Sequence, residues 1–447
     1  MTAIARNLFT APDGIVDLAA FSAAVAAARP LIAHRPAVVN LHADRFVFTV
    51  ILVAALLNGQ TVVLPPSVAP EALREISTRY DAPLVVEEDD RLLGTADSAD
   101  GPILTPQHLV AHALGEVHVF TSGSTATPVR HVKTWAMLAG GAEVTVELAR
   151  RIAPGAERIV LIGTTPHRHM YGLEATVATP LSFLAEAWRP AVFYAADLEA
   201  ALSTLAADPR AAAVLVTTPA HLKHLDLSIR RASALRGIIS ATAPLASEAA
   251  ARVEQHGKLR VFEIYGCTEA GSMAIRRTAR EEDWTPSAGF TFSVMGDIAF
   301  ATAPHLPATT QIPDRLSLRP NGALRLEGRS DEQISVAGKR TTIGAVNAIL
   351  AAAALPCDAV AARGLDGQDA LVVFAAAYED AKLADEALES AIRSRLLAYL
   401  DPVLVPRRIF VVDRIDRDGT GKVSAATLEA LRAEGMRRGG RSPRDRA

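Results

Sequence analysis

The chain has 447 residues, of which 50% are hydrophobic and 21% are charged. This composition indicates a globular protein, and the length exceeds one typical hydrophobic core, so we expect one large domain and a smaller one. A formal net charge of -3 provides no general attraction for nucleic acid or anionic lipid. Any anion must therefore be bound in a specific pocket.

The cysteine content and the apolar runs bear on the cellular compartment. Cys267 and Cys357 are too few for a disulfide framework or a cysteine-based zinc site. The amino-terminal stretch lacks the basic and apolar regions of an export signal. The longest apolar run, residues 46–57, is shorter than the roughly twenty residues of a membrane-spanning helix, so it predicts a buried helix. We expect a cytoplasmic protein without a membrane span, monomeric or homodimeric.

Short β-branched runs alternate with alanine-rich stretches of helical period along the first part of the chain. The predicted strands begin at residues 37, 61, 83, 158, 212, 235 and 260. This alternation favours α/β layering with largely parallel strands. Several of these strands run into loops rich in Thr, Ser, Gly and Pro. Because open α/β sheets bind ligands where the carboxyl ends of strands meet their loops, we expect the chemistry there.

The sequence changes in character near residue 329. A predicted helix at 343–355, a hairpin at 363–376 and a helix near 381–399 are enough for one small α+β domain. The last stretch is basic, rich in Gly and Pro, and nearly free of apolar residues, which is typical of disorder. We expect an α/β large domain of layered sheets and helices over 1–329, a small α+β domain over 330–430, and a disordered tail over 431–447.

The stretch TSGST, residues 121–125, is a candidate anion-binding loop. Successive backbone N–H groups after a strand form a concavity for anions, hydroxyls add donors, and glycine allows close approach. Alone, such a string is more often a polar surface turn. The G-x-x-x-x-G-K-[ST] pattern is absent, which excludes the P-loop NTPase interpretation. No G-x-S-x-G elbow surrounds Ser122 or Ser124, so a hydrolase nucleophile is not supported.

Three further motifs carry chemistry that suits a nucleotide. Glu269 follows Thr268 in the strand-end stretch YGCTEAG, a suitable carboxylate for Mg²⁺ held against a polyphosphate. Asp314 precedes GRSDE, and a carboxylate there can accept ribose hydroxyls. Lys422 ends DRDGTGK, where a Gly-Thr-Gly turn presents one ammonium group. A calcium-loop interpretation of DRIDRDG fails, because Arg414 stands at the first ligand position and no Glu closes the loop.

In order and spacing, the four motifs resemble the adenylate-forming superfamily, which comprises acyl-CoA synthetases, aryl and fatty acid ligases and the adenylation domains of peptide synthetases. The resemblance extends from about residue 40 to about residue 425. It implies a loop that grips the β- and γ-phosphates of ATP through Thr121, Ser122, Gly123, Ser124 and Thr125. The chain departs from the family at Ala126, where glycine is usual, and at Val129, where lysine is usual. We expect Arg130 or Lys133 to supply the missing charge.

The resemblance also implies an AMP site and a catalytic lysine. The stretch SATAP would stack beside adenine and line the acid pocket, Tyr265 would contact adenine, Thr268 the α-phosphate and Glu269 the Mg²⁺ ion. Asp314 and Arg329 would contact the ribose. The implied AMP-site residues around these positions also include Ala241, Thr242, Ala243 and Gly266.

The small domain would swing about Asp331 between two half-reactions and would deliver Lys422 to the reacting oxygens. A desolvated lysine and Mg²⁺ can stabilise the charge that develops when a carboxylate attacks the α-phosphate. Ala345 and Asn347 replace residues that are commonly acidic in the family, which bears on contacts in the thioester-forming state.

The stretch TTPHRHMYGLEATV resembles the family's Pro-x-x-His motif and places His169 beside the carboxylate of the acid. The implied pocket residues are His169, Tyr171, Gly172, Thr242 and Gly266. Amino-acid-activating members place an aspartate near this loop to pair with the α-ammonium group. No Asp lies between Ile162 and Tyr194, so an acid without an amino group is favoured.

A looser resemblance, carried by HMYGLEATV and KTW, is to compact ligases of aryl polyene and xanthomonadin-like clusters. It implies a hydroxybenzoate-type aryl acid, or an acyl chain, transferred to an acyl carrier protein. The sequence therefore predicts an ATP- and Mg²⁺-dependent acid–thiol ligase whose acceptor is a phosphopantetheine thiol, with Lys422, His169 and Glu269 as catalytic residues. The alternatives are an acyl-CoA synthetase for a fatty or aryl acid, a catalytically weakened adenylate-binding protein, and a luciferase-like oxidoreductase that shares the first half-reaction.

Overall fold

The structure is a computed structural model that describes residues 6–65, 68–87, 101–121, 128–222, 234–296, 298–329, 333–336, 339–351, 353, 355–364, 371–378, 384–416, 423 and 425–438. The chain forms two compact units. Unit 1 comprises Met1–Pro65, Ser77–Phe120 and Arg130–Ser330, and unit 2 comprises Pro66–Ile76, Thr121–Val129 and Asp331–Ala447. The large α/β part and the smaller strand-rich carboxyl-terminal part confirm the predicted fold class.

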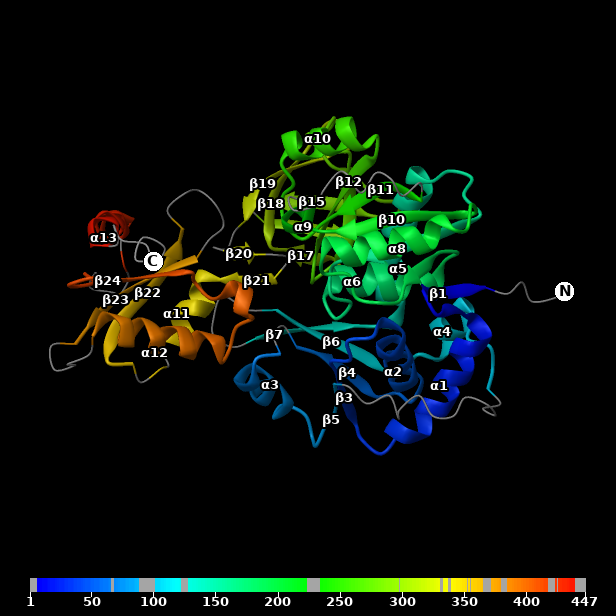
Figure 1. The fold of residues 1–447 in the computed structure, drawn as a ribbon, viewed down its shortest axis with the longest axis horizontal. Coiled ribbons are helices and arrows are strands. Elements are labelled where there is room, and N and C mark those ends of the chain that lie inside the picture. Colours follow the sequence, from blue (N-terminus) through cyan, green and yellow to red (C-terminus); the bar gives the residue numbers. More distant parts are fainter. Residues whose placement is uncertain are drawn as a thin grey trace. The chain divides into compact units, whose positions relative to one another are not determined.

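The largest sheet described in unit 1 has nine strands (Figure 1). Their order across the sheet is β14 (Thr285–Pro286), β13 (Gly271–Arg276), β12 (Arg260–Cys267), β11 (Leu235–Ser240), β10 (Ala211–Thr217), β8 (Arg158–Gly163), β9 (Glu186–Trp188), β1 (Asn7–Ala11) and β2 (Gly14–Asp17). The central strands β8, β10, β11 and β12 pair in parallel. The carboxyl ends of these four strands therefore share one edge of the sheet.

Helices cover both faces of this sheet, as the side chains of β10 show. Ala211, Ala213 and Leu215 pack in a cluster with α8 (Ala195–Ala206). The alternate residues Ala212, Val214 and Val216 pack in a second cluster with α5 (Trp135–Ile152). A strand buried on both faces gains from apolar residues at every position, which explains why AAAVLVT does not alternate with polar residues.

A second sheet in unit 1 contains the strands predicted at residues 37, 61 and 83. Its order is β5 (Leu84–Val86), β3 (Ala37–Asn40), β4 (Thr61–Leu64), β6 (Glu116–Thr121) and β7 (Val129–Lys133). Helix α2 (Arg45–Leu57) belongs to the same hydrophobic core as β3 and β4 and is buried from Arg45 to Leu56. Asp44 caps α2 by accepting a hydrogen bond from the Val47 amide at 3.0 Å. The predicted buried helix at 46–57 is confirmed.

The remaining described elements of unit 1 are helices and small sheets around the two large sheets. The helices are α1 (Leu18–Ile32), α4 (Pro106–His112), α6 (Met170–Leu173), the π-helix η3 (Glu174–Ala178), α7 (Thr179–Ser182), α9 (Pro219–Leu222) and α10 (Ser247–Gly257). The strands are β15 (Thr291–Met295), β16 (Ile298–Thr302), β17 (Thr310–Ile312), β18 (Asp314–Leu318) and β19 (Leu324–Arg329). β15, β16 and β17 form one small sheet, and β18 pairs with β19.

The described part of unit 2 combines small sheets with helices. Its elements are α3 (Pro70–Ser77, whose last residue lies in unit 1), β20 (Gln333–Val336), β21 (Lys339–Thr342), α11 (Ile343–Ala351), β22 (Cys357–Arg363), β23 (Leu371–Ala377), α12 (Asp385–Leu397), the 3-10 helix η5 (Pro402–Leu404), β24 (Arg408–Val411) and α13 (Ala425–Arg438). The hairpin predicted at 363–376 is confirmed, because β22 and β23 pair antiparallel from Arg363 and Leu371. Asn347 links α11 to β22 by accepting a hydrogen bond from the Ala361 amide at 2.6 Å.

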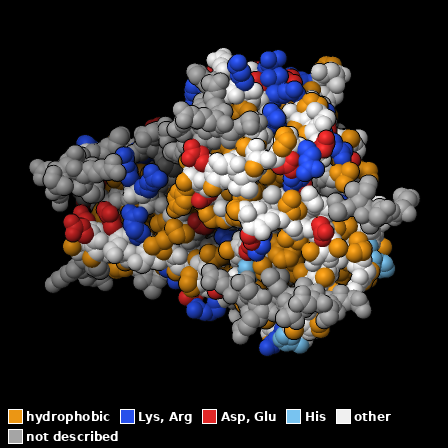
Figure 2. All heavy atoms as spheres, turned by 45° about the vertical axis from the view of Figure 1, so that its right-hand side comes forward, with side chains coloured by type: hydrophobic (Ala, Val, Ile, Leu, Met, Phe, Trp, Pro, Cys, Tyr) orange, Lys and Arg blue, Asp and Glu red, His pale blue; other side chains and the backbone are white. Residues whose placement is uncertain are grey.

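The carboxyl-terminal tail differs from expectation. Helix α13 continues to Arg438, so residues 431–438 of the expected disordered tail are helical. Leu431 is buried in a cluster with Val372 and Phe374 of β23, and this apolar contact stabilises the helix beyond residue 430. Among the residues described, no helix is both long and apolar enough to cross a membrane. Basic and acidic side chains are interspersed on the face shown in Figure 2.

Candidate active site

The turn that carries Glu269 joins two antiparallel strands of the nine-stranded sheet. β12 ends at Cys267, which is the cross-strand partner of Gly271 at the start of β13. A Cβ atom on Gly266 would lie 2.6 Å from the carbonyl oxygen of Gly271, and Gly271 itself has a φ of +79°. The two glycines therefore permit the tight turn. The Glu269 side chain is 31% exposed there, so its carboxylate is accessible.

Tyr265 and Asp314, predicted to contact adenine and ribose, are joined by a hydrogen bond. The Tyr265 hydroxyl donates to Oδ2 of Asp314 at 2.9 Å, and both side chains are buried. The Tyr265 ring also packs against Trp284, with ring centroids 5.6 Å apart. Asp314 begins β18, and its cross-strand partner in β19 is Arg329. Three separate stretches of the sequence thus meet at one place in unit 1.

Hydroxyl side chains gather at the carboxyl ends of β8 and β10. The Oγ1 atoms of Thr164 and Thr217 are 2.8 Å apart, and Nδ1 of His221 lies 3.1 Å from Oγ1 of Thr164. Thr217 is beside Ser240 in the parallel pairing of β10 with β11. The loop that follows β11 therefore begins at the same edge of the sheet, where ligands of open α/β folds bind.

The loop after β11 contains the predicted adenine-site residues Ala241, Thr242 and Ala243. Thr242 has a φ of +81°. A β-branched residue rarely adopts this left-handed conformation, which costs about 1–3 kcal/mol and is concentrated at functional sites. The strained backbone at Thr242 is consistent with a functional loop.

The segment around His169 forms the start of a helix. His169 is the N-cap residue of α6, and its amide donates to the Pro166 carbonyl at 3.1 Å. A Cβ atom on Gly172 would overlap that same carbonyl, so glycine is required there. The Tyr171 hydroxyl donates to the Ile239 carbonyl of β11 at 3.0 Å. This bond ties two predicted pocket segments, around Tyr171 and after β11, to each other.

His167, two residues before His169, is a buried and neutral histidine with a structural role. Its Nε2–H group donates to the His42 carbonyl at 2.9 Å, and its ring lies 4.5 Å from that of Phe48. Burial, assisted by the charge of Arg45, lowers the pKa of His167 to about 3. Arg45 is itself buried and donates hydrogen bonds to the carbonyls of Trp188 and Gly163.

The basic residues after the predicted phosphate loop have other partners than expected. Lys133 is 1% exposed, and its Nζ atom donates to the Glu269 carbonyl at 2.6 Å. His131, two residues earlier on β7, has Nε2 3.9 Å from Oε1 of Glu269. Arg130 interacts with Tyr80 by charge and a side-chain hydrogen bond. Lys133 is therefore buried and directed at the turn, and the expectation that Arg130 or Lys133 supplies the charge for phosphate stays a prediction.

The residues at the turn suit a magnesium ion. Mg²⁺ is usually held by one or two carboxylates together with phosphate oxygens and water. Glu269 supplies one accessible carboxylate, and Thr268 supplies a neighbouring hydroxyl. A site with one protein carboxylate would leave the remaining positions of the ion to phosphate and water, so Glu269 fits the role predicted for it.

Several predicted site residues lie outside the described residues. They are Ser122, Gly123, Ser124, Thr125, Asp331 and Lys422. Thr121 is described as the last residue of β6, and Arg329 is described through its strand pairing only. The roles predicted for all of these residues stay predictions.

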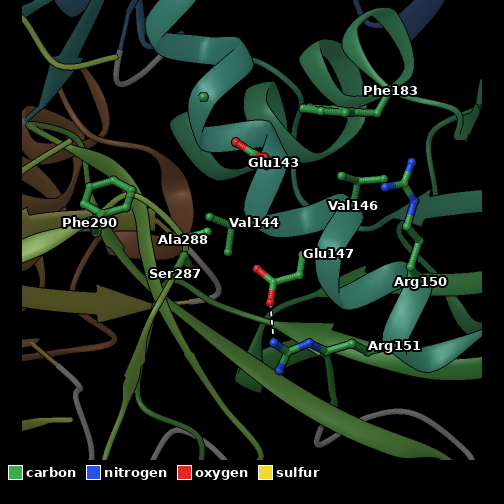
Figure 3. A pocket seen from close by; sticks show the side chains of 11 residues that line it. Glu143, Val144, Val146, Glu147, Arg150, Arg151, Phe183, Ser287, Ala288 and Phe290 are labelled. Carbon is green, nitrogen blue, oxygen red and sulfur yellow. Dashed lines mark hydrogen bonds and ion pairs between the residues drawn. The ribbon is translucent and has the colours of Figure 1, made fainter. Parts of the chain in front are cut away.

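A cavity of about 440 Å³ lies elsewhere in unit 1 (Figure 3). Helix α5 supplies Glu143 and Glu147 to its lining, and Phe290 and Phe183 lie on different sides of that helix in this view. Glu147 is paired with Arg151 in this view. None of the predicted site residues lines this cavity, so it is separate from the predicted acid pocket.

Sequence reasoning missed Glu174, a buried carboxylate next to the Glu269 turn. Oε2 of Glu174 accepts hydrogen bonds from the amide and the hydroxyl of Ser272, at 3.1 and 2.6 Å. Burial raises the pKa of Glu174 to about 7, while the Ser272 bonds and the charge of Lys133 oppose the shift. The signal in the sequence was an isolated acidic residue inside the otherwise apolar stretch MYGLEATVA.

Comparison with known proteins identifies a family and several related sequences. Residues 116–296 match the model of a family described as AMP-binding enzyme. A 4-coumarate–CoA ligase of Rhodobacter capsulatus is 30% identical over 303 residues, which cover 64% of this chain and 69% of that protein. A 4-coumarate–CoA ligase of Halorhodospira halophila is 29% identical over 68% of this chain and 73% of that protein.

Solved structures share the fold. The o-succinylbenzoate CoA synthetase of Bacillus subtilis, bound to a product analogue, superposes with a TM-score of 0.75 at 16% identity, covering 95% of this chain and 96% of that one. The same synthetase has also been solved with ATP and a magnesium ion, with a TM-score of 0.59, 15% identity, and coverage of 96% and 97%.

The fold and the sequence relatives define an enzyme that activates a carboxylic acid through an adenylate. The chain belongs to the AMP-binding enzyme family, part of the adenylate-forming superfamily. It is an ATP-dependent, AMP-forming acid–thiol ligase.

Proposed function

We propose that this chain activates an aryl carboxylic acid of the hydroxybenzoate type and transfers the acyl group to the phosphopantetheine thiol of an acyl carrier protein. In the first step a carboxylate oxygen attacks the α-phosphorus of ATP and pyrophosphate leaves. In the second step the thiol sulfur attacks the acyl carbon, loses its proton, and AMP leaves. The similarity to 4-coumarate–CoA ligases supports an aryl acid.

The Tyr265–Asp314 hydrogen bond is the observation that carries the nucleotide site. It orients a buried carboxylate, a group that accepts hydrogen bonds and would accept a ribose hydroxyl. The Tyr265 ring would pack against adenine, beside the loop that contains Thr242. Arg329, across the strand pair from Asp314, would complete the ribose contacts.

The phosphates would be bound by the loop of residues 121–125 and by the Glu269 turn. A magnesium ion held there would offset the negative charge of the phosphate oxygens. Glu269 would ligand the ion, and Thr268 would donate a hydrogen bond to the α-phosphate. Lys422 would donate to the oxygens on which charge develops, and His169 would border the acid's carboxylate.

The charges near the predicted acid pocket favour an acid without an amino group. The acidic residues between Gly163 and Tyr194 are Glu174 and Glu186. Glu174 is bonded to Ser272, and Glu186 is bonded to Arg158, Thr10 and Asn7. An amino-acid substrate would need a carboxylate partner for its buried ammonium group. Both carboxylates are buried, Glu186 in its bonds to Arg158 and Glu174 against the Glu269 turn through Oε2, so this segment offers no exposed carboxylate to an ammonium group.

The acceptor is either a carrier protein or free CoA, which present the same thiol. The likeness of HMYGLEATV and KTW to compact ligases of pigment clusters supports a carrier protein. The CoA ligases among the relatives support CoA as the second candidate.

Pyrophosphate release tests the proposal. Purified protein would be given ATP and Mg²⁺ with a panel of benzoates, cinnamates, fatty acids and amino acids, first without a thiol and then with CoA or a candidate carrier protein. We expect the fastest release with a hydroxybenzoate and acyl transfer to the carrier. A preference for fatty or amino acids would contradict the aryl assignment. If no acid of the panel supported release, the catalytically weakened adenylate-binding alternative would be favoured.

A further inference from the structure

Two buried ionisable residues hold the Glu269 turn from both ends. At one end, Nζ of Lys133 donates to the Glu269 carbonyl at 2.6 Å. At the other end, Oε2 of Glu174 accepts from the amide and hydroxyl of Ser272, at 3.1 and 2.6 Å. All four residues belong to unit 1. The main chain from Glu269 to Ser272 is thus fixed by side chains that lie far from it in the sequence.

These two side chains occupy a position that the surrounding chain is built to accommodate. Lys133 and Glu174 are each 1% exposed, and each shifts the other's ionisation by charge. Cβ atoms on Gly141 and Gly271 would overlap Oε1 of Glu174, so both glycines leave space for the carboxylate. Buried charges are costly unless paired and hydrogen-bonded. Their placement beside one turn therefore points to a role in holding that turn.

The elements that supply the pair adjoin other parts of the site. Lys133 is the last residue of β7, which follows the predicted phosphate loop. It faces the same side of the strand as His131, because side chains two residues apart in a strand point the same way. Glu174 is the first residue of the π-helix η3, which continues from α6 and His169. π-Helical turns are rare and frequent at functional sites. The turn is therefore tied to both the phosphate-loop strand and the acid-pocket helix.

We propose that Lys133 and Glu174 are positioning residues that hold the Glu269 turn in the conformation in which Glu269 binds Mg²⁺. The proposal rests on the role assigned to Glu269 in the proposed function. It also gives Lys133 a role that differs from that of the family's loop lysine, whose position is occupied by Val129: the Lys133 ammonium group acts on the turn from inside the protein.

Three variants separate the contributions. Glu174→Leu removes both acceptor bonds to Ser272, whereas Glu174→Gln keeps an amide oxygen that can accept from it. Lys133→Met removes the bond to the Glu269 carbonyl but keeps most of the side-chain volume. The matched control is Glu186→Gln, a change at another buried carboxylate that is bonded to Arg158 in β8 and lies outside the turn.

Amide hydrogen exchange of the nucleotide-free protein measures the turn directly. We expect residues 268–272 to exchange at least about tenfold faster in Glu174→Leu and Lys133→Met than in the wild type, because the restraining bonds are lost. Glu174→Gln should restore most of the protection, and Glu186→Gln should leave the turn unchanged. Unchanged exchange in folded Glu174→Leu and Lys133→Met would overturn the proposal. If one of these two variants fails to fold, the other decides alone: turn exchange in it equal to that of the wild type would count against the restraint of the turn by Lys133 and Glu174.

The consequence for the metal is measured by titrating Mg²⁺ in the pyrophosphate-release assay. We expect Glu174→Leu and Lys133→Met to need about tenfold more Mg²⁺ for half-maximal rate, with a smaller loss of kcat at saturation. An unchanged Mg²⁺ requirement together with faster exchange would show that Lys133 and Glu174 restrain the turn but do not position Glu269 for Mg²⁺. Because the exchange measurement needs no substrate, it tests whether Lys133 and Glu174 restrain the turn even if no acid supports pyrophosphate release.

Discussion

The Tyr265 hydroxyl and the Asp314 carboxylate meet through a 2.9 Å hydrogen bond, although 49 positions separate them in the sequence. The bond fixes the orientation of the carboxylate at the start of β18 against Tyr265 of β12, the strand that leads into the turn that carries Glu269. A carboxylate held in this way is preorganised for a ribose, because less ordering remains to be done when the nucleotide binds.

Loss of this bond should weaken nucleotide binding. A hydrogen bond to a charged group contributes about 1.5–3 kcal/mol, and Tyr265 acts on the ribose only by orienting Asp314. Tyr265→Phe should therefore lose part of this energy and raise KM for ATP about two- to tenfold with a smaller change in kcat. Asp314→Ala should have a larger effect, because it removes the ribose acceptor itself. Steady-state pyrophosphate release at varied ATP measures both. Tyr194→Phe, at an exposed tyrosine, is the control. A KM for Tyr265→Phe equal to that of the wild type would mean that the bond does not prepare the site.

Lys422 should be needed for the first half-reaction and not for the second. Removal of one charge-stabilising donor costs about 100-fold or more in rate, so Lys422→Ala should nearly abolish adenylate formation. Thioester formation from a chemically prepared acyl-adenylate should stay close to the wild-type rate. Arg414→Ala, at an exposed cation a few residues earlier, provides the comparison. Equal loss of both half-reactions would contradict the assigned role.

Asp331 should matter as a hinge. Proline restricts φ, so Asp331→Pro should slow thioester formation by about tenfold or more while adenylation changes by less than about threefold. Asp331→Asn keeps backbone freedom and should retain both rates. Separate single-turnover measurements of AMP-ester and thioester formation give the two values. A uniform decrease in both steps would argue for damage to folding and against a hinge.

His167 should make stability sensitive to acid. Its pKa is lowered to about 3 in the folded protein, mainly by burial, so the folded state keeps the ring neutral while the unfolded chain takes up a proton below about pH 6.5. The stabilisation is complete above pH 6.5 and decreases as the pH falls from 6.5 toward 3, by up to about 1.4 kcal/mol per pH unit.

Urea unfolding between pH 4.5 and 8 tests this dependence. His167→Gln can still donate a hydrogen bond to the His42 carbonyl but does not titrate, so its free energy of unfolding should fall less steeply below pH 6.5 than that of the wild type. Parallel curves for the two proteins across the whole range would show that His167 is not the group responsible.

Much of the architecture followed from local patterns. The apolar run at 46–57 became the buried helix α2, and the strands predicted at 158, 212, 235 and 260 became the parallel centre of the nine-stranded sheet. Such patterns are readable because a residue's burial depends on the face of the helix or strand it occupies, and that face repeats with a fixed period. The tail was misjudged because Leu431 is buried by a contact with β23, which no local pattern reveals.

The sequence by itself determined the family and the residue types of the site, since the four motifs occur in order along one chain. Only the tertiary structure decided which partners those residues have. It joined Tyr265 to Asp314, bonded Lys133 to the carbonyl of the Glu269 turn, and revealed Glu174 as the carboxylate that holds Ser272. A motif records which groups are present, whereas the direction and burial of a side chain depend on segments that are distant in sequence and meet only when the chain packs.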